Sequence, residues 1–98
     1  MIFYYTEKEK VKMNYCYVIA RIISDIDYKF MMEKKKYAKA VMQIELTNKS
    51  IIKAVAYNLT ADYVLRNLNQ GMEIAIEGEL HNNEIEIKSI EIFIQYIL

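Results

Sequence analysis

The sequence predicts an all-β domain in which five strands close into a Greek-key barrel, with one short helix between the third and fourth strands. Three observations carry this prediction. Strand-like alternation recurs along most of the chain, and one helix-forming segment interrupts it at residues 60–69. The chain has two glycines, Gly71 and Gly78, and they stand where a turn and a bend are needed. Alternation of this kind buries one face of each strand in a common core.

Composition sets the class of protein. The chain has 98 residues, of which 54% are hydrophobic, so it forms one domain with enough apolar surface for a packed core. No apolar run approaches the roughly 20 residues of a membrane span, and no secretory signal is recognisable. The single cysteine, Cys16, cannot form an internal disulfide, which suits a reducing compartment. We therefore expect a cytoplasmic protein without a membrane segment.

The first strand is predicted at residues 14–24. Residues 1–12 alternate poorly and are interpreted as an N-terminal arm, so the barrel domain covers residues 13–98. One face of the first strand is apolar and is formed by Cys16, Val18, Ala20 and Ile22. The segment from Asp25 to Lys36 is polar and charged, and we expect it to form a long loop to the second strand.

The second and third strands are predicted at residues 37–47 and 51–57. Their inward residues are mostly small and apolar, and include Ala38, Ala40, Met42, Ala54 and Ala56. Such small side chains leave room for another element to pack on top of them. The helix at residues 60–69 supplies that element, with Thr60 as its N-cap and Gly71 as its stop. We expect it to plug one end of the barrel through Leu59, Tyr63, Leu65 and Leu68.

The last two strands are predicted at residues 72–80 and 85–94, joined by a hairpin turn at residues 81–83. Asparagine tolerates the left-handed conformation that such turns need, and two of the three turn residues are asparagines. Gly78 fits a bend or a bulge where a small barrel coils sharply. The isoleucines of the fifth strand change phase near Lys88 and Ser89, which predicts a second bulge.

This order of elements is that of an OB-fold barrel, a fold that mostly binds nucleic acid or protein. The chain also resembles the bacterial single-stranded DNA-binding protein family. The resemblance rests on Tyr57, the short helix, Gly71 and the sequence Glu77-Gly78-Glu79-Leu80, and on residues 17–22 followed by Asp25. It covers about residues 14–94.

The resemblance implies a function and a set of partners. Tyr57 stands where the family places a base-stacking aromatic, and Lys53 stands where it often has a basic residue. The chain ends without the family's acidic tail, which favours a bare barrel of accessory, phage, plasmid or primosomal type. Single-stranded DNA is the implied partner, with RNA as an alternative. A homodimer or homotetramer and contacts with replication proteins are further implications.

Charge and aromatic residues indicate where a strand would bind. Residues 26–53 hold seven lysines against three acidic residues, a net charge of +4, although the whole chain is neutral. Binding of single strands requires cations that follow phosphates and flat rings that stack on bases. The candidate nucleic-acid-binding residues are Tyr57, Lys53, Tyr37, Lys39, Tyr28, Phe30, Lys34, Lys35, Lys36, Arg21 and His81.

Catalytic chemistry has little support in the sequence. His81 and Cys16 are each the only residue of their type, so neither has the partners of a zinc site or of a cysteine–histidine nucleophile pair. We expect no enzyme, no cofactor and no metal. A protein-interaction module is the alternative function, favoured by the zero net charge and by the acidic final third of the chain, where six glutamates face one lysine.

Overall fold

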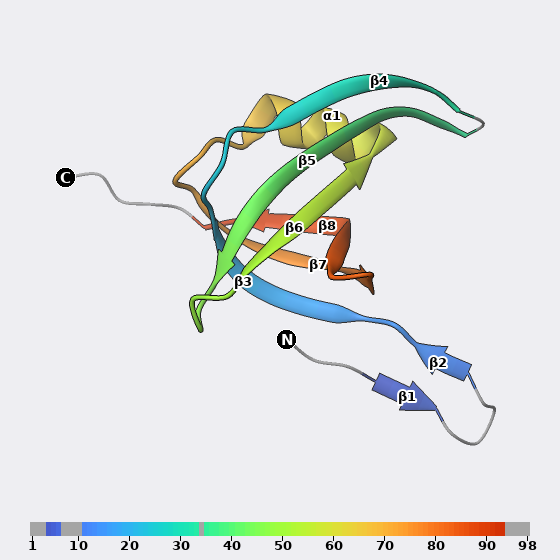
Figure 1. The fold of residues 1–98 in the computed structure, drawn as a ribbon, viewed down its shortest axis with the longest axis vertical. Helices are drawn as coiled ribbons and strands as arrows, with labels where there is room; N and C mark the ends of the chain where they lie inside the picture. Colours follow the sequence, from blue (N-terminus) through green and yellow to red (C-terminus); the bar gives the residue numbers. More distant parts are fainter. Residues whose placement is uncertain (1–3, 7–10, 34, 94–98) are drawn as a thin grey trace.

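The computed structural model describes residues 4–6, 11–33 and 35–93 (Figure 1). Its main sheet contains β3 (Cys16–Ile22), β4 (Asp27–Glu33), β5 (Lys36–Leu46), β6 (Ile51–Tyr57), β7 (Glu73–His81) and β8 (Glu84–Ile92). Five of these strands close a ring in the order β3-β7-β8-β6-β5, because β3 pairs with both β7 and β5. The predicted five-stranded OB-fold barrel is confirmed. The described residues contain one helix, α1 (Asn58–Asn67).

The loop prediction for Asp25 to Lys36 is wrong. Residues 27–33 form β4, which pairs with β5 in a long antiparallel hairpin. Figure 1 shows this hairpin curving past α1. The helix lies between β6 and β7, but it follows the fourth strand of the main sheet in chain order and not the third. The charged composition of this segment favours a loop, but strands at the end of a sheet also often carry charged side chains.

The helix begins and ends two residues earlier than predicted. Thr60 is not the N-cap: Tyr57 holds that position in an extended conformation, without a side-chain capping bond. Gly71 lies beyond the helix end, in a turn where its φ of 96° favours glycine and its N–H donates to the carbonyl of Ile22 at 2.7 Å.

Among the residues that the structure describes, no helix has the length and apolar character that a membrane span requires.

The helix also packs through a different face. It buries Ala61 and Val64, and Leu68, the C-cap residue after its last turn, is buried with them, whereas Leu59 is 78% exposed and Leu65 is 49% exposed. Successive helical residues are about 100° apart, so the three buried residues lie within about 60° of one another. The four residues predicted to plug the barrel are spread over more than half of the helix circumference. Only one of them, Leu68, can therefore reach the core.

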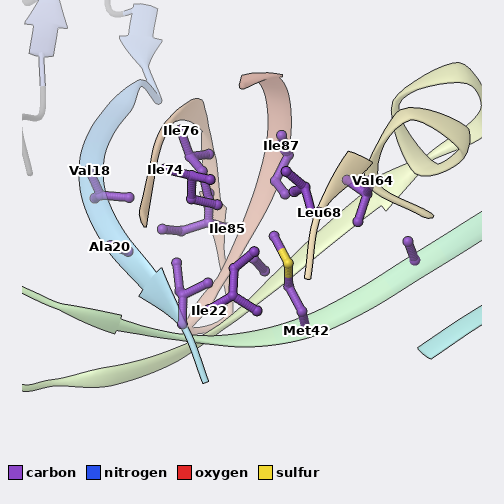
Figure 2. Close-up of a cluster of buried hydrophobic side chains, with 14 of the residues drawn as sticks. Val18, Ala20, Ile22, Met42, Val64, Leu68, Ile74, Ile76, Ile85 and Ile87 are labelled. Carbon is purple, nitrogen blue, oxygen red and sulfur yellow. The ribbon is translucent and has the colours of Figure 1, made fainter. Parts of the chain in front are cut away.

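The core is a cluster of aliphatic side chains inside the barrel. Figure 2 shows it with side chains from β3, β5, β7, β8 and α1, and the cluster joins Val64 and Leu68 to Met42. Ile22, Ile74 and Ile85 have no exposed surface. The strict alternation of buried and exposed residues along β3 confirms the face that the sequence predicts for this strand.

A single bulge in the β7–β8 hairpin accounts for both predicted irregularities, the bend or bulge at Gly78 and the bulge near Lys88 and Ser89. Glu77 pairs with Ser89 and Gly78 pairs with Ile87, so Lys88 is the extra residue on β8. Gly78 lies opposite this bulge, and a β-carbon there would stand 2.1 Å from the carbonyl oxygen of Glu86. The bulge therefore needs glycine at position 78, and it explains the change of phase along β8.

The β7–β8 turn has the predicted geometry. His81 pairs with Glu84, and the two residues between them, Asn82 and Asn83, have φ values of 48° and 65°. A two-residue turn with both φ values positive matches the twist of the strands that it joins. This turn brings His81 next to the first residues of β8.

The N-terminal residues that the structure describes form a separate ladder. β1 (Tyr4–Thr6) pairs antiparallel with β2 (Val11–Met13) in a two-stranded sheet. Residues 1–3 and 7–10 of the proposed arm lie outside the described residues. The division into an arm at residues 1–12 and a barrel at residues 13–98 stays a prediction.

Candidate nucleic-acid interface

Three strands bring basic and aromatic residues into one row on the outside of the barrel. Lys29 on β4 pairs with Lys39 on β5, and Lys39 pairs with Tyr57 on β6. Directly paired residues have their β-carbons about 5 Å apart on one face of a sheet. Lys29, Lys39 and Tyr57 therefore form a continuous row, which we call the Tyr57 row. Lys29 falls within the segment expected as a loop, so its pairing with Lys39 could not be foreseen.

Tyr57 occupies the last position of β6, immediately before the helix. It is half-buried, and the Nζ atom of Lys36 lies 4.2 Å from the centroid of its ring. It also borders a surface hollow of about 260 Å³, which we call the Tyr57 hollow. The other residues that line this hollow are Val55, His81, Glu84 and Glu86. The ring is thus at the surface and outside the isoleucine core.

The charge on this face changes sign from one side of Tyr57 to the other. Lysines flank it on β4 and β5, whereas β8 contributes Glu84 and Glu86. Lys53, two positions before Val55 on β6, points its Nζ atom to within 3.4 Å of the Glu84 carboxylate. A phosphate chain is therefore attracted by the lysines of β4 and β5 and repelled by the glutamates of β8.

His81 lies in an acidic cluster at the edge of the hollow. Its Nε2 atom is 3.0 Å from Glu79 and 3.6 Å from Glu86, and Lys88 donates to Glu86 at 2.7 Å. That hydrogen bond raises the pKa of Lys88. The ligand atoms of Glu79, His81 and Glu86 lie within 4.8 Å of one another, so within the part of the chain that the structure describes this group could hold a metal ion. Exposed acidic groups are common without one, and the expectation of no metal stays a prediction.

Tyr28 and Tyr37 share a contact that strand patterning does not predict. The Tyr28 hydroxyl donates to Asp62 of α1 at 2.7 Å, and the Tyr37 hydroxyl donates to the same carboxylate at 3.0 Å. The bond from Tyr28 is the largest cause of a lowered pKa at Asp62. Asp62 is 34 and 25 residues away in sequence, and no local motif links such distant residues. Both tyrosines therefore fasten the β4–β5 hairpin to the helix.

The tip of the hairpin carries the remaining candidates from that segment. Phe30 is 78% exposed, and its ring meets the Tyr28 ring edge-on at 5.5 Å. Lys35 is exposed and has a φ of 64°, and its carbonyl accepts a hydrogen bond from the Asn58 side chain at 2.8 Å. Lys34 lies outside the described residues. Phe30 and Lys35 are accessible but lie outside the Tyr57 row, and Phe30 stands on the face of β4 opposite to Lys29, because it pairs with the buried Ala38.

Arg21 lies elsewhere on the barrel. It sits on β3 between Glu73 and Glu45 in the strand register, and its guanidinium is 3.9 Å from the Glu73 carboxylate. Glu45 is six residues from Lys39 along β5, which corresponds to roughly 20 Å. The structure therefore separates Arg21 from the Tyr57 row.

Comparison with solved structures identifies the class of fold. The SSB domain of a Synechococcus sp. protein superimposes with a TM-score of 0.72 and 16% identity, over 82% of this chain and 96% of that one. The single-stranded DNA-binding protein of Thermus aquaticus gives a TM-score of 0.73 and 13% identity, over 88% of this chain and 43% of that one. PriB of Ralstonia solanacearum gives a TM-score of 0.61 and 14% identity, over 82% and 97%.

These likenesses confirm the resemblance at the level of the fold. The chain is an OB-fold barrel of the form found in bacterial single-stranded DNA-binding proteins and in PriB. It spans 43% of the length of the Thermus aquaticus protein. No family model and no curated protein matches the chain.

Proposed function

We propose that this protein binds single-stranded DNA independently of sequence and acts in replication, recombination or the transfer of a genetic element, without catalysing a reaction. The Tyr57 row carries the proposal. It places one accessible ring next to lysines on the outside of an OB-fold barrel, where Lys36 and Lys39 lie within reach of a strand that crosses β5 and β6. The solved structures that share this fold include proteins named for binding single-stranded DNA.

A base reaches the Tyr57 ring by displacing the ammonium group of Lys36. A surface cation–π contact is worth about 0.5–1 kcal/mol. Stacking of a base on an aromatic side chain is worth about 1–3 kcal/mol. Stacking therefore prevails, and the flexible Lys36 side chain becomes free to pair with a phosphate. Lys29 and Lys39 extend the cationic path along the β4–β5 hairpin.

We also propose a cytoplasmic homo-oligomer, a dimer or a tetramer. Exposed apolar side chains on the barrel, Ile19 at 39% and Ile51 at 60%, offer surface that a second copy could cover. Light scattering coupled to size-exclusion chromatography measures the mass directly. A mass of twice or four times that of one chain agrees with this part of the proposal, and the mass of one chain contradicts it.

Fluorescence titration against oligo-dT, oligo-U and duplex DNA tests the function, with each ligand measured at about 50 and about 200 mM salt. We expect oligo-dT to bind more tightly than duplex, with an affinity that falls steeply with salt because counterions are released from the phosphates. Oligo-U separates a preference for DNA from one for RNA. Absence of binding to either single strand at the lower salt concentration contradicts the proposal.

A protein-interaction module is the second candidate function. Phe30 and Met32 on β4 and Leu59 on α1 are at least 78% exposed, and exposed apolar side chains of this size are typical of surfaces that dock a partner. The acidic residues of β8 beside the Tyr57 hollow also favour it. A stoichiometric partner that Phe30→Ser releases, together with no gel shift of any single strand, would select this function.

A further inference from the structure

We propose that the Tyr57 hollow is a nucleobase pocket that favours guanine, with the Glu86 carboxylate as its hydrogen-bond acceptor. This inference rests on the proposed function, since the base belongs to a bound single strand. Carboxylates beside the stacking ring repel the phosphates of a bound strand. We infer that they recognise another part of the ligand, its base.

The register of the strands places Glu86 within reach of a base on Tyr57. Val55 and Tyr57 are two residues apart on β6, and Val55 pairs with Glu86 on the parallel strand β8. Two residues along one strand and one step to the next give a diagonal of about 8 Å between α-carbons. Long side chains interact across such diagonals. Val55, which is 2% exposed, provides an apolar floor between them.

The Glu86 carboxylate is held in place and retains acceptor capacity. Its side chain is 28% exposed, and its Oε2 atom accepts a hydrogen bond from Lys88 at 2.7 Å. Its Oε1 atom is 3.6 Å from the His81 ring nitrogen, which is longer than a hydrogen bond. A carboxylate offers about four lone-pair directions, so both oxygens of Glu86 can accept from a ligand. Lys88 and His81 act as positioning residues for this group.

Guanine is the base that matches a carboxylate. Its Watson–Crick edge carries two neighbouring donors, the N1–H and the N2 amino group, which can bond to the two oxygens side by side. Thymine presents one N–H between two carbonyl oxygens, and those oxygens would face the negative charge of Glu86. Adenine and cytosine each present one amino group beside a ring acceptor. Single strands leave these edges free to be read.

The preference is confined to one position of a bound strand. Stacking on Tyr57 and the lysine contacts accept every base, so overall binding remains tolerant of sequence. A strand with guanine in many registers therefore gains affinity, whereas oligo-dT still binds through phosphates and stacking. The preference for guanine is measured as the ratio of the affinity for a guanine-containing strand to the affinity for oligo-dT. This ratio does not depend on how tightly either strand binds.

The experiment compares three oligonucleotides of about ten residues, within the site sizes known for OB folds. These are alternating thymine–guanine, alternating thymine–inosine and oligo-dT. Titrations contain EDTA, which removes any metal from the Glu79, His81 and Glu86 group, and lithium chloride, which does not support guanine quadruplexes. We expect the thymine–guanine strand to bind at least about fivefold more tightly than oligo-dT, as for a bidentate base contact. Inosine lacks the N2 amino group, so its strand falls between the two.

Two variants assign the preference to Glu86. Glu86→Gln keeps the size of the side chain but replaces one acceptor by a donor, so the ratio should fall to about one while oligo-dT binds equally or more tightly. Glu91→Gln removes the same charge from β8 outside the hollow and should leave the ratio unchanged. Thermal melting followed by circular dichroism verifies that both variants fold.

The outcomes separate the inference from the function on which it rests. A wild-type ratio of one with firm oligo-dT binding overturns the guanine pocket and leaves the proposed function standing. A ratio that survives Glu86→Gln overturns the role of Glu86. Failure of the folded wild-type protein to bind any of the three strands overturns the proposed function itself, and the pocket falls with it.

Discussion

Asp62 of helix α1 accepts a hydrogen bond from the Tyr28 hydroxyl at 2.7 Å, and its second oxygen accepts one from Tyr37 at 3.0 Å. These two bonds join a single helical turn to both strands of the β4–β5 hairpin. The hairpin also carries Lys29 and Lys39 of the Tyr57 row. The hairpin that Asp62 holds against the helix is therefore the same one that carries the lysines beside Tyr57.

This contact predicts a particular pH dependence of stability. Chiefly because of the bond from Tyr28, the pKa of Asp62 is lower in the folded protein than the value of about 4 expected for an unfolded chain. A carboxyl group with a lowered pKa stabilises the fold fully above the unfolded value, and this contribution is lost as the pH falls through the folded value. The melting temperature of the wild type should therefore fall in that window by more than that of Asp62→Asn.

Melting curves between neutral and strongly acidic pH check this prediction. Asp27→Asn, which removes an acidic residue from β4, is the matched control and should follow the wild type. Parallel curves for the wild type and Asp62→Asn would show that the hydroxyl contacts do not stabilise the hairpin in solution.

Replacement of Tyr57 should weaken binding without unfolding the barrel. Tyr57→Ala removes the stacking ring, and we expect affinity for oligo-dT to fall by about 1–3 kcal/mol. Tyr57→Phe keeps the ring and should retain most of the affinity. Fluorescence anisotropy with a labelled oligonucleotide gives the three dissociation constants. The control is Tyr63→Ala, a tyrosine of α1 that is 41% exposed and outside the Tyr57 row. Equal losses in the two alanine variants would remove Tyr57 from the site.

Lys39 should contribute through phosphate contact alone. Lys39→Gln should weaken oligo-dT binding and reduce the slope of log affinity against log salt by about 0.7, the value for one phosphate contact to a single strand. Lys49→Gln, in the turn between β5 and β6 at the other end of the sheet, should change neither quantity. A salt slope that is unaltered in Lys39→Gln would place the phosphate path elsewhere.

Gly78 should be the more sensitive of the two glycines to substitution. A β-carbon at Gly78 meets a backbone oxygen, which cannot move aside as a flexible side chain can. We expect Gly78→Ala to lower the free energy of unfolding by at least about 2 kcal/mol, as in other overpacked sites. At Gly71 a β-carbon meets nothing within 4 Å. Asparagine tolerates a positive φ, so Gly71→Asn should lower the free energy of unfolding by less. Urea denaturation measures both, and similar midpoints for the two variants would contradict the role assigned to the bulge.

Much of the barrel is predictable because strand alternation is a local property. The faces of β3, the Asn82–Asn83 turn and the need for glycine at position 78 all follow from residues within one hairpin or strand. The size of an apolar side chain does not identify the buried face of the helix. The inward faces of β5 and β6 are lined by alanines, and a face of Ala61, Val64 and Leu68 brings the helix closer to them.

The candidate site was less predictable because its geometry depends on register. Tyr57 and Lys39 were named from their positions on two strands, and the structure pairs them directly. The contact of Asp62 with Tyr28 and the approach of Glu86 to Val55 join elements that are distant in sequence. A single sequence does not specify such contacts. The acidic side of the Tyr57 hollow therefore emerged only from the folded chain.

Mapping of the bound strand by NMR tests the central claim most directly. Titration of isotope-labelled protein with oligo-dT should perturb the backbone amides of Lys39, Val41, Val55 and Tyr57 on the outward face of β5 and β6. The amides of Tyr17, Ile19 and Ala75, on the β3–β7 side of the barrel, should remain unchanged. Perturbation confined to the β3–β7 side, or to helix α1, would contradict the assignment of the Tyr57 row as the nucleic-acid interface.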